Sequence, residues 1–194
     1  AALNFRDVMN ALGTYPGDAG QLGDECAGVV VRVGAGITHL AVGDEVMALL
    51  PGSLASYVTG NVNLVARRPV TLSLEQAAGV PIVFATAAVA LERIAGLRRE
   101  QGDQPRKRVL IHAGAGGVGL AAISFSLSAG AEVFATAGSQ AKRDYLRSLG
   151  VHHVMDSRSL AFSEFVLELT DGEGVDAVLN SLAGEFIPAS LAVV

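Results

Sequence analysis

A glycine-rich turn is the sequence feature with the most specific chemistry. Gly114, Gly116 and Gly119 form a G-x-G-x-x-G pattern that follows the apolar run Val109–His112 and opens a helical stretch. The first glycine permits a tight turn, the second lets backbone N–H groups approach a pyrophosphate, and the third lets the helix pack on the strand. A helix N-terminus also favours an anion. The sequence therefore predicts a dinucleotide site cradled by Gly114, Gly116, Gly117, Val118 and Gly119.

The residues after the next strand discriminate between dinucleotides. NAD enzymes usually place Asp or Glu about 20 residues beyond the glycines to hold the ribose 2′-OH, whereas this region reads Ala137-Gly138-Ser139. Ser139, Lys142 and Arg143 offer a hydroxyl and two cations where a 2′-phosphate would lie. Cations at a helix N-terminus oppose the macrodipole, which supports an anionic ligand; the alternative is a pair of exposed charges. The pattern favours NADPH over NAD and argues against a methyltransferase.

Metal chemistry has little support in the sequence. A catalytic zinc site needs three protein ligands and a structural one needs four, usually Cys or His. The chain has one cysteine, Cys26, and four histidines, of which His152 and His153 are adjacent. No nucleophile motif lies beside these or beside His112, so we expect structural or solvent-facing histidines. We expect no metal site, and a single cysteine without a signal peptide fits a cytoplasmic protein.

Composition sets the broad class. The 194 residues are 51% hydrophobic and carry 14 Lys+Arg against 19 Asp+Glu, which predicts a globular chain. The net charge of −5 gives no general attraction to nucleic acid. The longest apolar run, Ala77–Leu91, is shorter than the roughly 18–20 residues that span a membrane. Because the chain opens at Ala1 and stops in a helix-like segment, we expect part of a longer protein.

The first seventy residues indicate a small β unit. Turn signals separate four expected strands, which are Ala27–Val33, Glu45–Leu49, Ser56–Thr59 and Asn63–Ala66. Ser73 and Gln76 then form a capping-box pattern that predicts a long helix, or a helix pair broken near Pro81. The helical pattern continues through Ile94 to a stop at Gly96.

Strands and helices alternate after residues 99–108, which we interpret as a solvated loop. The expected order is strand Val109–His112, helix Gly117–Ser128, strand Glu132–Thr136, helix Gln140–Leu149, strand His153–Met155, helix Ser163–Thr170 and strand Asp176–Asn180. Such alternation implies a parallel sheet with right-handed crossovers. Four strands are visible, whereas a complete Rossmann unit has six. We therefore predict an α/β fold with a β domain at 1–72, a connecting helical segment at 73–98 and a truncated dinucleotide-binding domain at 99–194.

Several motifs in order resemble those of a known family. They are Leu3–Val8, Ala11–Gly17, Cys26–Gly28, Val42–Asp44, His112–Gly119 and Val178–Gly184. Together they resemble the enoyl reductase domain of modular type I polyketide synthases, over nearly the whole chain. This family is related to the animal fatty acid synthase enoyl reductase and to the zinc-free quinone oxidoreductases of the medium-chain reductase superfamily. The resemblance implies a partial GroES-like domain at 1–72, followed by an NADPH-binding Rossmann domain, doubly wound and incomplete at its C-terminus.

The resemblance also implies a reaction without metal. Zinc-containing relatives have Gly-His-Glu where this sequence has Gly23-Asp24-Glu25, so the resemblance is to the metal-free branch. The implied reaction is conjugate reduction of a trans-2-enoyl thioester, with hydride from NADPH to the β-carbon and a proton to the α-carbon. Tyr15 matches the family tyrosine, and a neutral phenol is able to donate that proton. The alternative is an amphipathic tyrosine at a domain edge.

Further site residues follow from the same resemblance. Asn4 matches a residue that lines the nicotinamide pocket, and Thr86 lies where relatives touch the cofactor. Ser157 and Arg158 match positions near the adenosine ribose phosphate. Asn180 and Ser181 end the fourth strand at the carboxyl edge of the sheet, where ligands bind in open α/β folds. Structural capping is the alternative role for Asn4, Thr86, Asn180 and Ser181.

The resemblance implies partners and leaves two alternative functions open. The implied partners are an acyl carrier protein bearing the phosphopantetheine-bound enoyl intermediate, other synthase domains in cis, and a second copy in a homodimeric synthase. The alternatives are a free-standing NADPH:quinone oxidoreductase and a non-catalytic NADPH-binding domain. The Leu3–Val8 and Asn180–Gly184 motifs favour the synthase domain over the free-standing enzyme.

Overall fold

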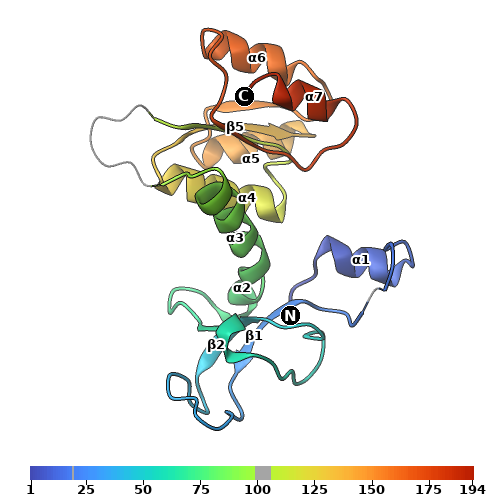
Figure 1. Cartoon of the computed structure of the whole chain (residues 1–194), viewed down its shortest axis with the longest axis vertical. Coiled ribbons are helices and arrows are strands. Elements are labelled where there is room, and N and C mark those ends of the chain that lie inside the picture. The colour runs from blue at the N-terminus through green and yellow to red at the C-terminus, as the bar shows by residue number, and fades with distance from the viewer. Residues whose placement is uncertain (19, 99–105) are drawn as a thin grey trace. The chain divides into compact units, whose positions relative to one another are not determined.

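The computed structural model describes residues 1–18, 20–98 and 106–194. It divides into two compact units, Ala1–Ile82 and Val83–Val194 (Figure 1). Most of the loop predicted at 99–108 lies outside the described residues. Within the described part of the chain, every helix is too short or too polar to cross a membrane.

The first unit contains a three-stranded antiparallel sheet in the order β1-β2-β3. Its strands are β1 (Glu25–Val29), β2 (Glu45–Leu49) and β3 (Val65–Arg67). The β2 bounds are those predicted. The first strand ends earlier than predicted because Val30 pairs with the Gly43–Asp44 turn, where its N–H donates to the Asp44 carbonyl at 2.9 Å.

Of the two other strand predictions in this unit, one was wrong and one was right only in part. Ser56–Thr59 has no ladder partner among the described residues, and its Tyr57 is 77% exposed. Asn63–Ala66 is divided between a 3₁₀ turn, η1 (Val62–Leu64), and β3. The turn forms because the Asn61 side chain accepts the Asn63 N–H at 2.9 Å, which replaces strand geometry with a local cap.

A helix that the sequence analysis did not predict, α1 (Phe5–Ala11), precedes the sheet. Its apolar residues Phe5 and Val8 are exposed, so they form no buried stripe. The buried Asp7 carboxylate fixes it instead, accepting the Asn4 N–H at 2.8 Å and the Gly23 N–H at 2.7 Å.

The connecting segment contains two helices with a break before Pro81, which is one of the two alternatives predicted from the sequence. Helix α2 (Leu74–Ala78) begins with the predicted capping box, in which the Gln76 N–H donates to Ser73 Oγ at 3.2 Å. Helix α3 (Pro81–Ala88) follows and continues as a π-helical turn, η2 (Val89–Ile94). Gly96 ends it at a φ of +67°, a left-handed conformation that favours glycine.

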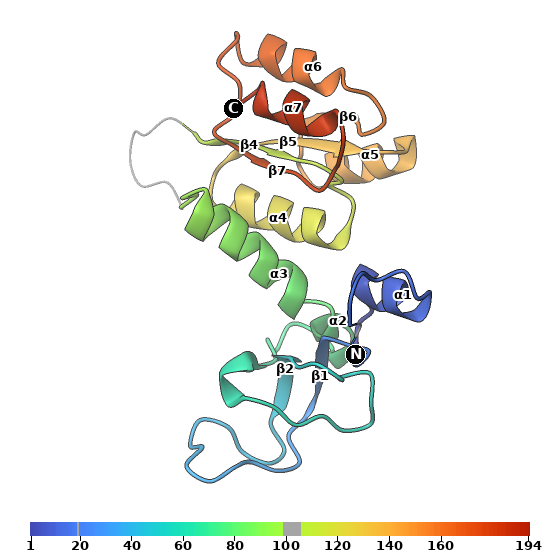
Figure 2. The same cartoon turned by 45° about the vertical axis from the view of Figure 1, so that its right-hand side comes forward.

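The second unit is a doubly wound α/β fold around a four-stranded parallel sheet in the order β6-β5-β4-β7. Its strands are β4 (Arg108–Ile111), β5 (Glu132–Ala137), β6 (His153–Asp156) and β7 (Ala177–Leu179), and its helices are α4 (Gly117–Ser128), α5 (Gln140–Ser148), α6 (Phe162–Leu169) and α7 (Phe186–Leu191). Figure 2 shows α4 and α5 on one face of the sheet and α6 and α7 on the other. The predicted strands and helices are confirmed, with small differences at their ends.

Successive side chains of β4 point to opposite faces of the sheet and pack into the hydrophobic cores on both sides. Val109 and Ile111 join the cluster that contains Ile123 of α4 and Leu146 of α5. Leu110 joins Phe162 on the opposite face. Burying such side chains contributes roughly 1.5–3 kcal/mol each, so the carboxyl end of β4 is a rigid support for the turn that follows.

Candidate functional site

The glycine-rich turn joins β4 to α4 through backbone contacts that leave no room for side chains. The Gly114 N–H donates to the Thr136 carbonyl at 2.8 Å, which ties the turn to β5. A Cβ at Gly119 would lie 2.5 Å from the Ala113 oxygen and 2.7 Å from the Gly114 backbone. Helix and turn therefore touch at a distance that only glycine permits.

The start of α4 has the features of a phosphate cradle. Helix α4 begins at Gly117, so the first-turn N–H groups of Gly117, Val118 and Gly119 have no partner within the helix. Gly116 and Gly117 are exposed, and a Cβ at Gly116 would lie 3.3 Å from the Ala113 oxygen. An anion could thus approach the backbone closely, as a pyrophosphate requires.

A second group of site residues surrounds Gly138, at the carboxyl ends of β5 and β6. Ser139 caps α5, because its Oγ accepts the Lys142 N–H at 3.4 Å. The Lys142 side chain is exposed. A Cβ at Gly138 would lie 3.3 Å from Ser157 Oγ and 3.5 Å from Arg158 Nε. The structure therefore brings Ser157 and Arg158, predicted from resemblance, beside the Gly138-Ser139 segment.

Arg143, the remaining cation of this group, is engaged with the protein itself. Its Nη1 donates to the Ala137 carbonyl at 3.0 Å and lies 3.1 Å from Asp156 Oδ2. Asp156 was not predicted as part of this group. Its signal was available, because an Asp two residues before Arg158 at the end of a strand is typical of an Asx turn.

The predicted residues at β7 and α3 have simpler surroundings. Asn180 folds its amide back on its own loop, accepting the Leu182 N–H at 2.8 Å and donating to the Leu182 carbonyl at 3.1 Å. This is the capping role that the sequence analysis left as an alternative. Ser181 is exposed beside it, and Thr86 is exposed on α3.

In the first unit, Asn4 is held by a buried carboxylate. Asn4 Nδ2 donates to Glu25 Oε1 at 3.0 Å, and Glu25 Oε2 accepts the Ile82 N–H at 2.8 Å. Glu25 is only 2% exposed. In the sequence, Glu25 is recognisable only as part of the Gly23-Asp24-Glu25 motif, and its contact with Asn4 was not predicted.

Tyr15 is half-buried and lies beside a cation. The Arg6 guanidinium carbon is 5.5 Å from the centre of the Tyr15 ring, a cation–π arrangement. Arg6 Nη1 also lies 3.3 Å from Asp24 Oδ1. Asp24, at the position where zinc-containing relatives carry histidine, is thus part of an ion pair.

The histidines have structural or solvent-facing positions, as predicted. His112 is 2% exposed and hydrogen-bonded through both ring nitrogens. His153 Nε2 lies 3.0 Å from Glu132 Oε1, and the ring stacks on Phe134. His152 is exposed.

Potential metal ligands and a groove beside β6 do not add to this site. Among the described residues, no cluster of three or more His, Cys, Asp or Glu side chains could hold a metal ion. Burial raises the pKa of the Cys26 thiol, which disfavours the thiolate that metals require.

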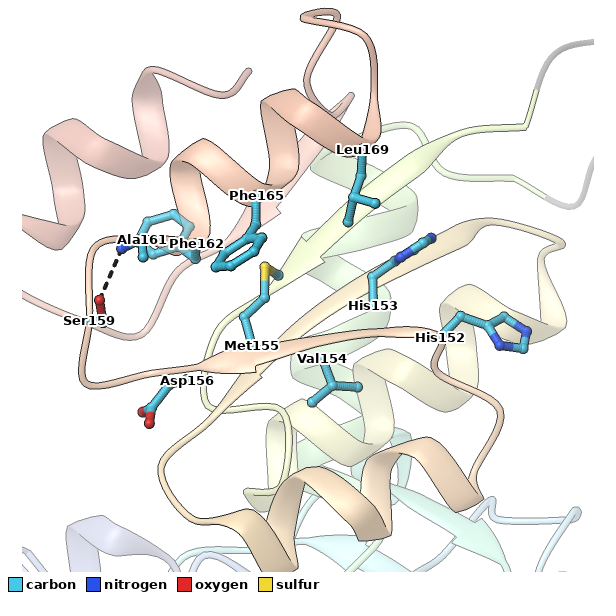
Figure 3. A pocket seen from close by; sticks show the side chains of 10 residues that line it. All are labelled: His152, His153, Val154, Met155, Asp156, Ser159, Ala161, Phe162, Phe165 and Leu169. Atoms are coloured by element: carbon cyan, nitrogen blue, oxygen red, sulfur yellow. Dashed lines mark hydrogen bonds between the residues drawn. The ribbon is translucent and has the colours of Figure 1, made fainter.

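A groove of about 460 Å³ runs between β6 and α6, where Figure 3 shows Met155 and Phe165 facing each other. It is lined by none of the predicted cofactor residues.

Comparisons with known proteins match nearly the whole chain. The models of the alcohol dehydrogenase GroES-like domain and of zinc-binding dehydrogenases match residues 1–97 and 117–194. The chain is 49% identical over 191 residues to the phenolphthiocerol synthesis polyketide synthase type I Pks15/1 of Mycobacterium marinum, covering 97% of this chain and 9% of that protein.

Solved structures give the same picture. The crystal structure of the CurK enoyl reductase is similar with a TM-score of 0.89 and 46% identity, covering 98% of this chain and 59% of that one. The structure of mycobacterial Rv1454c complexed with NADPH is similar with a TM-score of 0.85 and 32% identity, covering 98% and 59%. The chain thus spans less than two thirds of the length of these relatives.

Proposed function

Because the chain belongs to the alcohol dehydrogenase GroES-like family, and within it to the enoyl reductase domains of polyketide synthases, we propose that it forms part of an NADPH-dependent enoyl reductase. The substrate is a trans-2-enoyl thioester on an acyl carrier protein, and the product is the saturated thioester. The partners are that carrier protein, other synthase domains in cis and a second copy of the synthase.

The observation that carries the choice of cofactor is the group around Gly138. Ser139 and Lys142 follow β5, and Ser157 and Arg158 lie beside Gly138. Hydroxyls and cations suit a 2′-phosphate, whereas the end of β5 offers no carboxylate for a ribose 2′-OH. The similarity to a relative solved with NADPH supports the same choice.

The residues of the chain would divide the work as follows. The turn Gly114–Gly119 would hold the pyrophosphate on the first-turn N–H groups of α4. Asn4 and Thr86 would line the nicotinamide, Asn180 and Ser181 would close the carboxyl edge of the sheet, and Tyr15 would deliver a proton to the α-carbon. When bound, NADPH supplies the hydride for the β-carbon.

The test is the loss of NADPH absorbance with a crotonyl-pantetheine thioester, using a version extended to the length of the solved relatives. We expect turnover, and we expect Lys142→Ala to raise KM for NADPH without raising KM for NADH. Arg93→Ala, which removes an exposed cation on η2, is the matched control and should change neither value. NADPH binding without thioester reduction would instead favour a quinone oxidoreductase or a non-catalytic domain.

A further inference from the structure

Asp156, at the end of β6, contacts both arginines of the Gly138 group. Its Oδ2 lies 3.1 Å from Arg143 Nη1, and its Oδ1 accepts the backbone N–H of Arg158 at 2.9 Å. The first contact joins α5 to β6, and the second is the Asx turn that shapes the chain leaving β6. The Asp156 carboxylate therefore helps to position both Arg143 and Arg158, whose side chains have different roles.

The Arg143 side chain is held by contacts with the ends of β5 and β6. Its Nη1 donates to the Ala137 carbonyl at 3.0 Å, and its Nη2 donates to Gln140 Oε1 at 3.1 Å. The side chain is 17% exposed. Because Asp156 also balances its charge, Arg143 has little capacity left for a ligand.

Arg158 is placed differently. Its side chain passes close to Gly138, where a Cβ would lie 3.5 Å from Nε and 3.9 Å from Nη2. Ser157 is fixed beside it by its N–H, which donates to the Ala137 carbonyl at 3.3 Å. Within residues 1–18, 20–98 and 106–194, no ion pair or hydrogen bond engages the Arg158 guanidinium or the Lys142 ammonium.

The charged side chains around Gly138 therefore form two sets, one neutralised within the protein and one available to a ligand. Arg143 and Asp156 neutralise each other, while Lys142 and Arg158 leave two positive charges. A phosphate monoester carries about −1.5 to −2 at neutral pH, which matches two cations. We propose that Asp156 is a positioning residue of the 2′-phosphate subsite, which it builds by pinning Arg143 and by turning Arg158 toward Gly138.

This inference rests on the proposed use of NADPH and adds a residue that touches no cofactor atom. It explains why an acid can lie beside a phosphate subsite, since one carboxylate oxygen is already paired with the Arg143 guanidinium and the other accepts the Arg158 N–H. The opposite expectation is equally clear: if Asp156 merely repelled the phosphate, removing it would tighten binding.

The experiment compares adenosine 2′,5′-bisphosphate with 5′-AMP, which lacks the 2′-phosphate, by isothermal titration calorimetry on the extended protein. We expect Asp156→Ala to weaken binding of the bisphosphate by about tenfold, equivalent to about 1.4 kcal/mol, and to leave 5′-AMP within about twofold. Asp156→Asn keeps an oxygen for the Arg158 N–H but loses the ion pair, so its effect should be smaller. Glu168→Ala, which removes an exposed acid of α6, is the matched control and should change neither affinity.

Any other result would contradict either the positioning role of Asp156 or the proposed use of NADPH. Equal weakening of both ligands would make Asp156 a merely structural residue, and unchanged or tighter bisphosphate binding would exclude the positioning role. Wild-type protein that shows no preference for the bisphosphate over 5′-AMP would overturn the NADPH proposal itself. A preference for the bisphosphate that is as large in Asp156→Ala as in the wild type would overturn the inference and leave the proposed cofactor standing.

Discussion

The Ser190 hydroxyl accepts a hydrogen bond from Nε2 of His112 at 3.0 Å, because its own proton is donated to the Phe186 carbonyl at 2.6 Å. Nδ1 of His112 then accepts from Thr136 Oγ1, also at 3.0 Å. This network assigns a neutral imidazole with its proton on Nε2. It links α7, β4 and β5 directly beneath the glycine-rich turn.

The stability of the second unit is expected to fall as pH decreases from 6.5 toward 4. Burial lowers the pKa of His112 from 6.5 to about 4, so the unfolded chain binds more protons than the folded chain in this window. Stability therefore rises with pH up to 6.5, and the contribution of His112 is constant above it. Urea unfolding at a series of pH values measures this, and His112→Gln should flatten the curve. An unchanged slope in the variant would assign the titration to another group.

Gly119→Ala should destabilise the second unit by about 1–3 kcal/mol and abolish tight NADPH binding. Its Cβ would meet backbone atoms of Ala113 and Gly114, which cannot move without displacing the turn. Gly117→Ala is the control for stability, since its Cβ would meet only Cγ1 of Val83 at 3.1 Å, a side chain that can shift. Thermal unfolding and calorimetric titration with NADPH give the two values. Equal stabilities of the two variants would contradict the close approach of helix and turn.

The elements that sequence predicted well are those specified by neighbouring residues. Helix α4 begins at Gly117 and ends at Ser128, as predicted, because the glycines at one end and Ala129-Gly130 at the other leave little choice. The capping box of Ser73 and Gln76 is equally local. Alternating apolar runs then imply the parallel sheet, since only strands with helical crossovers bury both faces.

The elements and contacts that sequence missed depend on distant partners. Alternation at Ser56–Thr59 indicated a strand, but strand formation needs a neighbour, which that segment lacks among the described residues. Asn4 could be matched to a cofactor position, whereas its orientation depends on Glu25, 21 residues away. Glu25 in turn depends on Ile82, 57 residues further on. Such pairings follow from the tertiary fold, and local periodicity contains no signal for them.

Glu25→Gln should destabilise the first unit by about 1–3 kcal/mol. Both carboxylate oxygens accept, one from the Asn4 amide and one from the Ile82 N–H, and an amide offers only one oxygen. If the glutamine oxygen stays on the Ile82 N–H, its NH2 group faces Asn4 Nδ2, and only a flip of the Asn4 amide removes this contact between two donors. Glu45→Gln is the matched control, because Glu45 pairs with Arg68 at the surface and should cost less than about 1 kcal/mol. Chemical denaturation compares them, and equal losses would mean that the burial of Glu25 has no energetic consequence.

Tyr15→Phe should lower kcat for enoyl thioester reduction by about 10²–10⁴-fold, the range for a lost general acid, with little change in KM for NADPH. The ring can keep its place under the Arg6 guanidinium, since phenylalanine also supports a cation–π contact. Tyr57→Phe removes an exposed hydroxyl of the same unit and should leave kcat unchanged. Steady-state kinetics on the extended protein decides the matter, and full activity of Tyr15→Phe would assign the proton to another donor.

Ser126→Ala should stabilise the second unit by about 0.5–2 kcal/mol. Ser126 is fully buried on α4, and its Oγ has no hydrogen-bond partner within the described part of the chain. Alanine removes an unpaired polar group and is the better helix former, so both effects have the same sign. Ser128→Ala is the contrast, because Ser128 Oγ is exposed and donates to the Phe125 carbonyl at 2.8 Å, so its removal should bring little gain. Urea unfolding of both variants measures the difference. A loss of more than about 1 kcal/mol in Ser126→Ala would show that the hydroxyl is satisfied after all, as by a buried water.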